Sequence, residues 1–203
     1  SSFATTYYSR ATGDWNSIST WSLTSGGGAA SAFPTINDDV IIDKGFTVTV
    51  TANAECKTLS FTAGSFSNSL VLNSGIALTV SGAVTIPRAS SNFMNTFNVD
   101  AGTATVGSLS FTSGGGTVRH QVLISTGTLN VAGNVTGSTG NTSGSIIFSD
   151  AGTLNLSGTI YSNLDGTLTT FAGSTVEYKG TSAQTVANFT YRNLVLSNTG
   201  SKT

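Results

Sequence analysis

Apolar residues recur along this chain at an interval of about 25 residues. One column of aliphatic residues is spaced at 25, 25, 26, 25 and 26 positions: Leu59, Val84, Leu109, Val135, Ile160 and Val186. Two further columns keep the same interval: Val80, Val106, Val131 and Leu156; and Leu72, Val99, Ile124 and Phe148. Like residues at a fixed interval are the signature of a repeat architecture. The repeat is therefore the strongest indication of the fold.

Each 25-residue unit contains three short runs in which apolar and polar residues alternate, the pattern of a β-strand. In one unit these runs are residues 122–124, 129–131 and 134–136, separated by Gly, Asn, Ser and Thr, which favour turns. Helical periodicity is absent over any length. The pattern predicts an all-β fold, a right-handed three-sided parallel β-helix whose coils stack about 4.8 Å apart. A β-sandwich also has short, regularly spaced strands, but it does not require like residues in register every 25 positions.

We expect six to seven coils of about 25 residues, in a β-helix that covers residues 38–203. The first coil is predicted to hold strands at 40–42, 47–50 and 58–61, and a last coil begins at 194–196. The sequence then ends at Thr203, in the middle of a predicted coil. Because natural solenoids cover such open strand edges, we expect the natural protein to be longer or this end to meet another molecule.

Residues 1–37 do not follow the repeat and are predicted to be an N-terminal cap. This segment contains both tryptophans and several other aromatic residues: Trp15, Trp21, Tyr7, Tyr8, Phe3 and Phe33. These side chains suit a cover over the core of the first coil. The alternative is an aromatic platform that binds sugars, for which Trp15, Trp21 and the more distant Tyr161 are the candidate glycan contacts.

Composition narrows the function. Of 203 residues, 64 are Ser or Thr and 24 are Gly, whereas only 8% are charged and the net charge is −1. Without a basic stripe, nucleic-acid binding is disfavoured, and no apolar run approaches the roughly 20 residues of a membrane helix. The single cysteine, Cys56, excludes an intramolecular disulfide framework, and the single histidine, His120, excludes clustered-histidine metal sites.

Two stretches resemble large secreted proteins of Bacteroidetes. The N-terminal stretch also resembles the start of the G8-type glycine-containing β-helix module, through residues 7–15, 19–22, 37–42, 47–50 and 56–59 with Pro34 and Gly45. The second stretch resembles repeats of long adhesin-like chains, through residues 174–180, 183–186, 191 and 193–197. Together they cover roughly a third of the chain. The resemblance implies a β-helix that is exported by the type IX system and is secreted or displayed at the cell surface. It implies no ligand and no catalytic residue, and the family's usual C-terminal sorting domain does not occur in this sequence.

Three acidic residues form the densest cluster of carboxylates: Asp38, Asp39 and Asp43. Calcium binds six to eight hard oxygen atoms, so these residues are the candidate ligands of a Ca²⁺ site between cap and coil. The alternative is that they form Asx turns at the start of the first coil. No other cofactor is predicted.

Catalysis on a β-helix usually means polysaccharide cleavage, and a hydrolase needs two opposed carboxylates. Asp100 and Asp150 occupy similar positions two coils apart. Near-identical sequences follow both residues, so their recurrence is explained by the repeat, in which each is a turn residue. Asp14, Asp38 and Asp39 are further candidates for a lyase or hydrolase fragment. We expect His120 on a polar face or turn and Cys56 buried in the first coil. The interpretation we favour is that the chain is not an enzyme.

Asn130 and Asn155 occupy the same position in neighbouring repeats, which predicts a short outward ladder of amides. We therefore expect a non-catalytic, stiff adhesin or fibre segment that binds neutral polysaccharide or a cell-surface glycan. The alternatives are the polysaccharide lyase or hydrolase fragment, a filament subunit that associates end to end through its C-terminal coil, and an ice-binding solenoid presenting outward threonines. Asn130, Asn155, Tyr161 and Thr169 interrupt the threonine ranks that ice binding needs.

Overall fold

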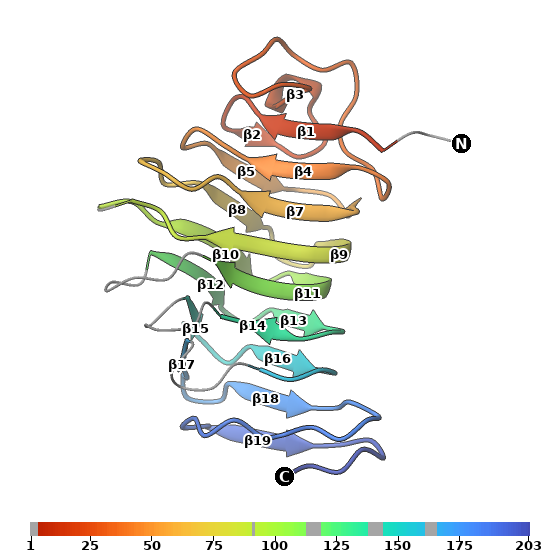
Figure 1. Ribbon diagram of the computed structural model, residues 1–203, viewed down its shortest axis with the longest axis vertical. Coiled ribbons are helices and arrows are strands. Elements are labelled where there is room, and N and C mark those ends of the chain that lie inside the picture. Colours follow the sequence, from red (N-terminus) through yellow and green to blue (C-terminus); the bar gives the residue numbers. More distant parts are fainter. Residues whose placement is uncertain (1–3, 91, 113–118, 138–143, 161–165) are drawn as a thin grey trace.

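The computed structural model describes residues 4–90, 92–112, 119–137, 144–160 and 166–203. These residues form a parallel β-solenoid of stacked strands (Figure 1). Within those ranges the helical structure is one 3-10 turn, η1 (Ile18–Thr20), near the N-terminus. The predicted all-β parallel β-helix is confirmed.

The strands form two sheets that run along the whole stack. The seven-stranded sheet contains β2 (Gly13–Asp14), β5 (Thr47–Val50), β8 (Ser69–Leu72), β10 (Asn95–Asp100), β12 (His120–Ile124), β15 (Ser145–Phe148) and β17 (Thr167–Thr169). The twelve-stranded sheet contains β3 (Trp21–Ser22), β1 (Thr6–Ser9), β4 (Asp39–Ile42), β7 (Thr58–Phe61), β9 (Ala77–Pro87), β11 (Thr103–Thr112), β13 (Thr128–Val131), β16 (Thr153–Leu156), β18 (Thr175–Tyr178) and β19 (Asn193–Leu196), with β6 (Ala54–Cys56) paired to β9 and β14 (Val135–Thr136) paired to β11.

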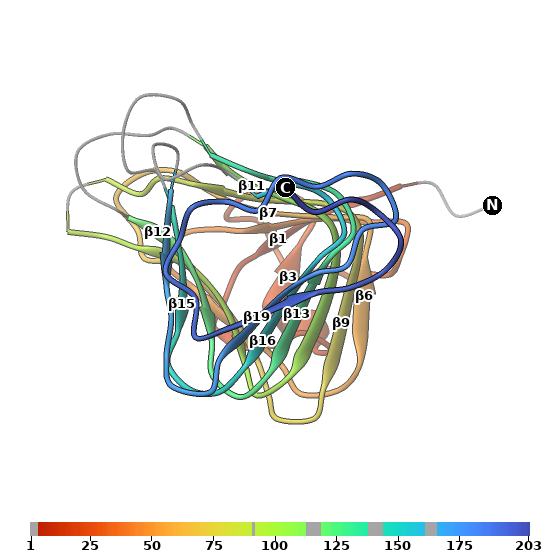
Figure 2. The ribbon, with the colours of Figure 1, turned by 90° about the horizontal axis from the view of Figure 1, so that it is seen from below.

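The solenoid has three sides because β9 and β11 each bend and contribute to two of them. The first half of β9 pairs with β6 and its second half pairs with β7, so one strand turns a corner of the coil. Seen along its axis, the stack has a roughly triangular outline (Figure 2). We call the side that contains β6, the first halves of β9 and β11, β13, β16, β18 and β19 the β13 side.

Strand register confirms most of the predicted columns. Leu59, Val84, Leu109, Val135 and Ile160 lie directly above one another, as do Val80, Val106, Val131 and Leu156. Their side chains are buried and form one continuous core. The column through Val99 is interrupted, because the register between β10 and β12 shifts between Asn98 and Asp100.

Two predicted boundaries differ from the structure. The third strand of the first coil is β6, whereas residues 58–61 form β7, which stacks directly on β4 and starts the second coil. The stacking also begins before Asp38, since β1 pairs in parallel with β4 and β2 pairs in parallel with β5. Among the strands of the described residues, β3 alone runs antiparallel to its neighbour, so the cap is a partial coil closed by a short reversed strand.

A column of glycines allows the coils to approach closely at one corner. A Cβ atom at Gly107 would lie 2.6 Å from the carbonyl oxygen of Gly82, and one at Gly133 would lie 2.7 Å from that of Gly107. Neither glycine has a positive φ, so its role is to leave room for the preceding coil. The regular spacing of glycines in the sequence therefore reflects coil stacking.

A ladder of buried polar side chains, which the sequence analysis did not identify, follows another corner. Asn68, Asn95 and His120 stack in register and are all fully buried. The Asn68 amide donates to Asn95 Oδ1 at 2.9 Å, and the Asn95 amide donates to the carbonyl oxygens of Thr62 and Pro87. These bonds replace the water that the amides lose on burial. The sequence signal was present: an interval of 27 and then 25 residues, each position at the start of a strand.

Candidate functional site

The two tryptophans proposed as glycan contacts lie in the core of the cap. Trp15 is 1% exposed and Trp21 is 0% exposed, and their rings meet edge to face at 5.1 Å. Trp21 Nε1 donates to the carbonyl oxygen of Trp15 at 2.6 Å. The pair therefore closes the first coil and does not form an exposed platform. Tyr161, the third proposed contact, lies outside the described residues.

The proposed calcium ligand Asp38 holds the start of the first coil. Its Oδ1 accepts a hydrogen bond from the backbone N–H of Thr5 at 3.0 Å. Its Oδ2 accepts from the N–H and the hydroxyl of Thr35, at 2.8 and 2.7 Å. This buried carboxylate thus ties two cap segments to the coil, through residues that precede it in the chain and not through an Asx turn.

The other two proposed ligands make separate contacts. Asp43 Oδ1 accepts from the N–H of Lys44 and from the hydroxyl of Thr62, at 2.7 and 2.9 Å. Asp39 Oδ1 accepts from the hydroxyl of Thr58 on the next coil at 2.6 Å. The described part of the chain contains no group of three or more His, Cys, Asp or Glu side chains placed to hold a metal ion. The structure therefore does not bring Asp38, Asp39 and Asp43 together as one ligand set.

The acidic pair considered for catalysis lies in turns. Asp100 ends β10 with φ +48°, and its carbonyl oxygen accepts from the N–H groups of Ser125 and Gly127. Asp150 follows β15, and its own carboxylate accepts from the N–H of Ala151 at 2.8 Å. Both residues thus shape the same corner of the coil, as their near-identical surroundings in the sequence indicated.

The prediction that His120 lies on a polar face or turn is wrong. Its side chain lies inside the solenoid. His120 is the first residue of β12 and is fully buried, with its ring 5.3 Å from that of Phe111. Nδ1 lies 2.8 Å from the carbonyl oxygen of Ile86, whereas Nε2 has no partner among the described residues. Burial lowers the pKa of His120, although the bond to Ile86 opposes this change. The imidazole therefore continues the interior amide ladder as a neutral group.

Cys56 is fully buried at the end of β6, as predicted. Burial raises the pKa of its thiol well above the ordinary value, and the charges of Asp39 and Asp38 add to this effect. The thiol stays protonated at neutral pH and is a packing residue, because nucleophilic cysteines need a lowered pKa.

The predicted ladder of amides is present on the β13 side, but Asn155 is buried, at 9% exposed, and its Oδ1 has no partner among the described residues. Asn155 donates to Asn130 Oδ1 at 2.9 Å, and Asn130 donates to the hydroxyl of Thr105 at 3.3 Å. Strand register extends this rank in both directions, giving the sequence Glu55, Thr79, Thr105, Asn130, Asn155, Glu177 and Val195. The rank is a continuous row of hydroxyl and amide groups with a carboxylate near each end.

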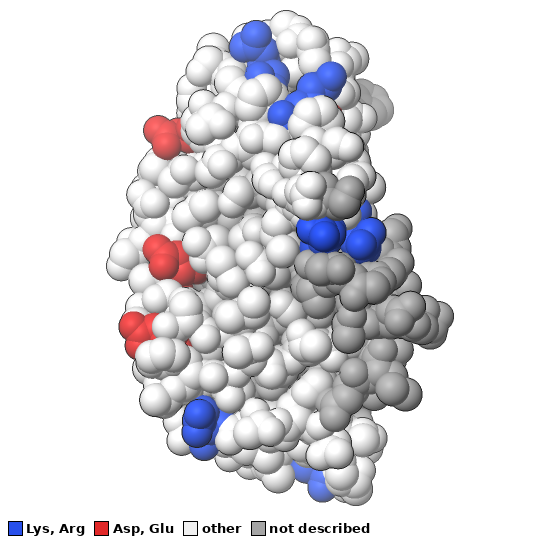
Figure 3. All heavy atoms as spheres, turned by 90° about the vertical axis from the view of Figure 1, so that its left-hand side faces the viewer, with Lys and Arg blue, Asp and Glu red and all other residues white. Residues whose placement is uncertain are grey.

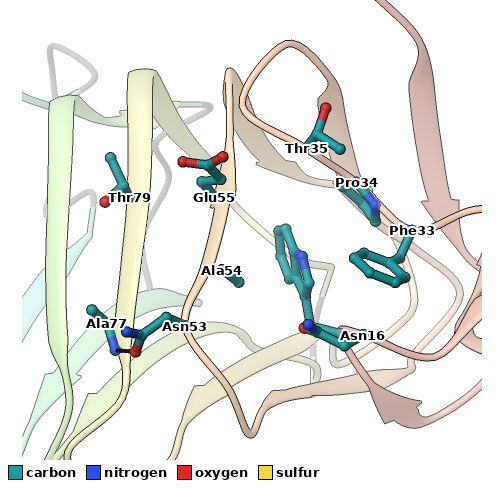
Figure 4. A pocket seen from close by; sticks show the side chains of 10 residues that line it. Asn16, Phe33, Pro34, Thr35, Asn53, Ala54, Glu55, Ala77 and Thr79 are labelled. Atoms are coloured by element: carbon teal, nitrogen blue, oxygen red, sulfur yellow. Dashed lines mark hydrogen bonds between the residues drawn. The ribbon is translucent and has the colours of Figure 1, made fainter.

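A cavity of about 440 Å³ opens where this rank meets the cap (Figure 4). The cap contributes Phe33, Pro34 and Thr35 from the segment before β4, with Trp15 and Asn16 from the segment after β2. The coils contribute Asn53, Ala54, Glu55, Ala77 and Thr79. Phe33 is 39% exposed, and Asn53 Oδ1 accepts from the N–H of Ala77 at 2.9 Å. The cavity combines an aromatic wall with amide, hydroxyl and carboxylate groups, and it is the candidate functional site. No single stretch of sequence predicts this cavity, because its walls come from segments far apart in the chain.

No family model matches this chain, and neither the curated proteins nor the solved structures contain a significant match to it. The geometry of the solenoid and its cavity is therefore the basis for a functional proposal. Within the described residues, no helix is long and apolar enough to span a membrane.

Proposed function

We propose that this chain is a non-catalytic module of a secreted or cell-surface protein, a stiff solenoid that adheres to neutral glycans. The observation that carries this proposal is the rank of hydroxyl and amide side chains on the β13 side, of which Thr79, Thr105 and Asn130 are members. Such groups both donate and accept hydrogen bonds, as sugar hydroxyls do. The resemblance of the sequence to adhesin-like Bacteroidetes chains supports the same role and an export by the type IX system.

The scarcity of charge supports a neutral partner. Only 8% of the residues are charged, and Figure 3 shows a face on which acidic and basic side chains are few and most of the surface is uncharged. A polyanionic ligand would need clustered Lys or Arg side chains. The continuous core supports stiffness, because each coil buries its apolar side chains against the coils on both sides.

The arrangement of carboxylates favours binding over cleavage. The cavity has one carboxylate in its lining, that of Glu55, whereas a hydrolase needs two on opposite sides of the scissile bond. Asp100 and Asp150 lie at a corner of the coil and serve in turns. An enzymatic role for this chain accordingly has no support in the placement of these residues.

The test is binding of the folded chain to immobilised neutral polysaccharides: β-glucan, α-glucan, chitin, mannan and galactan. We expect binding to at least one of them, with little dependence on salt because the contact is uncharged. Reducing-end assays on the same polymers should show no cleavage. Binding to none of them would contradict the proposal, and release of new reducing ends would favour the lyase or hydrolase alternative.

Ice adsorption belongs in the same screen. Thr103, Thr128 and Thr153 lie in register on the β13 side. In the adjacent rank, Asn130 and Asn155 lie beside two of these threonines. This side therefore does not present two parallel rows of threonine. We therefore expect no ice shaping, and ice shaping at micromolar concentration would favour the ice-binding alternative.

A second candidate, self-association, is favoured by β19. This strand lies at the end of the twelve-stranded sheet, and Leu194, Val195 and Leu196 are between 40% and 51% exposed. At the opposite end of the stack, β1 and β2 cover two sides, and the segment that contains Phe33 and Pro34 crosses the third, so head-to-tail growth would require that segment to move aside. Association would therefore be tail to tail, with two copies of β19 paired about a two-fold axis. Sedimentation equilibrium should show a monomer–dimer equilibrium, and a monomer at millimolar concentration would contradict it.

A further inference from the structure

The cavity beside Phe33 exists because one strand position of the stack is left empty. On the other two sides of the solenoid, the cap supplies β1 above β4 and β2 above β5. On the β13 side, β6 pairs with β9, and the described cap residues supply no strand on its other edge. The segment that contains Phe33 and Pro34 passes across this gap (Figure 4). The result is a recess with a strand edge on one side and an aromatic wall on the other.

The lining of the recess selects for a neutral, hydroxyl-bearing ligand. Its apolar part comprises the side chains of Trp15, Phe33 and Pro34 with two alanines. The polar part comprises amides, hydroxyls and the Glu55 carboxylate, and no Lys or Arg side chain lines the recess. An anionic ligand would therefore meet a carboxylate without a compensating cation. A volume of about 440 Å³ is in the range of small-molecule sites.

The indole of Trp15 provides an independent sign of a missing partner. Trp15 lines the recess and is buried, yet its Nε1–H donates to no acceptor within the described part of the chain. The neighbouring Trp21 Nε1–H, by contrast, has its acceptor at 2.6 Å. A buried donor without an acceptor costs free energy, and a ligand oxygen at this position would recover it.

We propose that this recess is a saccharide-binding site for one or two rings of a neutral glycan. The ring of Phe33 stacks on the apolar face of a pyranose, and Glu55 and Thr79 bind its hydroxyl groups. A small outward movement of the segment 33–35 uncovers Trp15 Nε1–H, which donates to a ring or hydroxyl oxygen. The rest of the glycan continues along the rank that begins with Glu55 and Thr79. This assignment rests on the proposed function and gives it a defined site.

The chain contains only two tryptophans, so its ¹H–¹⁵N spectrum has two indole signals, assignable with Trp15→Phe. We would titrate the labelled chain with cellotetraose, maltotetraose, chitotetraose and mannotetraose. The oligosaccharide whose polymer binds in the polysaccharide screen should shift the Trp15 indole signal and leave that of Trp21 nearly unchanged. An extended hexapeptide of alternating Thr and Val is the competing probe, since peptides can pair with a free strand edge. A shift caused by this peptide and by none of the oligosaccharides would overturn the assignment.

Two exposed phenylalanines provide a matched pair of variants. Phe33→Ala removes the aromatic wall and should weaken oligosaccharide binding roughly tenfold or more, the loss of one stacked ring. Phe171→Ala removes a ring that is 45% exposed and lies outside the recess, and it should leave affinity unchanged. Glu55→Gln keeps the shape of the side chain and should weaken binding about fivefold through loss of a charge-assisted hydrogen bond. Circular dichroism of each variant would confirm that it folds.

The possible results separate the two proposals. Binding that is lost with Phe33→Ala and kept with Phe171→Ala supports the recess as the site. Binding that survives Phe33→Ala and leaves the Trp15 signal unmoved overturns this assignment while the adhesive function stands. Absence of binding by the unaltered chain to every polysaccharide and oligosaccharide overturns both.

Discussion

The two ends of the solenoid differ in how their terminal strands and core side chains are covered. At the N-terminal end, Trp15 and Trp21 cover the first coil, and the short antiparallel strand β3 covers the edge of β1. At the C-terminal end, β19 pairs with β18 alone among the described strands, and Leu194 and Leu196 are exposed. The comparison shows that the stacking of coils does not by itself complete the fold. An end needs side chains from outside the repeat, and among the described residues such side chains cover the N-terminal end.

The coils between the ends differ in how completely their buried polar side chains are hydrogen-bonded. In the N-terminal half, Asn68 and Asn95 satisfy each other and the adjacent carbonyl groups. One coil further on, His120 continues the ladder but leaves Nε2 without a partner among the described residues. Buried polar groups stabilise a fold only when they are paired. The interior ladder is therefore fully paired at Asn68 and Asn95 and incomplete at His120.

Replacement of a cap tryptophan should have the largest effect. Trp21→Ala removes a fully buried ring and the donor to the Trp15 carbonyl, and should lower the free energy of unfolding by about 3–5 kcal/mol. Urea unfolding followed by circular dichroism measures the change. Trp21→Phe, which keeps part of the packing, should lie between that variant and the unaltered chain. Unfolding free energies equal to that of the unaltered chain would mean that the cap does not stabilise the first coil.

Loss of an interior amide should come next. Asn95→Ala removes the side-chain donor to the Pro87 carbonyl group, one of the two side-chain donors to the Thr62 carbonyl group, and one acceptor of the Asn68 amide, all in the core. We expect a loss of about 2–3 kcal/mol, since each unpaired buried group costs about 1–3 kcal/mol. The matched control is Asn130→Ala on the outer ladder, where the lost bond to Thr105 is exposed and the expected loss, about 1 kcal/mol or less, comes mainly from the amide of Asn155. Similar losses in the two variants would contradict the distinction between the inner and outer ladders.

Acid should destabilise the coil that contains His120. Burial lowers the pKa of this side chain in the folded state, so the unfolded chain, with the ordinary value of 6.5, binds a proton more readily. Stability from this group is therefore complete above pH 6.5 and is lost as pH falls towards the folded pKa, at no more than about 1.4 kcal/mol per pH unit. His120→Asn, which extends the amide ladder, should remove this dependence between pH 7 and pH 5. If the variant and the unaltered chain lose stability in parallel over that range, another group is responsible.

The smallest effect on stability is expected at β19. Leu196→Ala alters a side chain that is 51% exposed and should change the free energy of unfolding by less than about 0.5 kcal/mol. The same substitution should weaken tail-to-tail association in sedimentation equilibrium, because it removes apolar area from the open edge. Unchanged association would place the contact between copies elsewhere.

The repeat made the fold predictable, because residues that stack in register must be alike. The columns through Leu59 and Val80, the glycine corner and the amide pair Asn130 and Asn155 all follow from the 25-residue interval. The first coil was harder to predict because it is shorter: β7 stacks on β4 after 19 positions, from Asp39 to Thr58. The 25-residue interval therefore predicts the strands of the later coils but not the bounds of the first coil.

The candidate site was not predictable from the interval. It depends on residues outside the repeat, and the burial of Trp15 and Trp21 could not be distinguished from an exposed platform in the sequence. Phe33, which lines the recess, was identified only as one more aromatic residue of the cap. His120 could not be placed either, since its burial depends on the neighbouring Asn68 and Asn95 and on a ring contact with Phe111.

Hydrogen exchange followed by mass spectrometry tests the difference between the two ends most directly. Exchange reports the free energy of local opening along the chain. We predict slow exchange in β1 and β4, where the cap covers the stack, and exchange in β19 faster by two or more orders of magnitude at monomeric concentrations. Equal protection of β1 and β19 would contradict the account, since it would show that the exposed C-terminal strand is held as firmly as the capped N-terminal end.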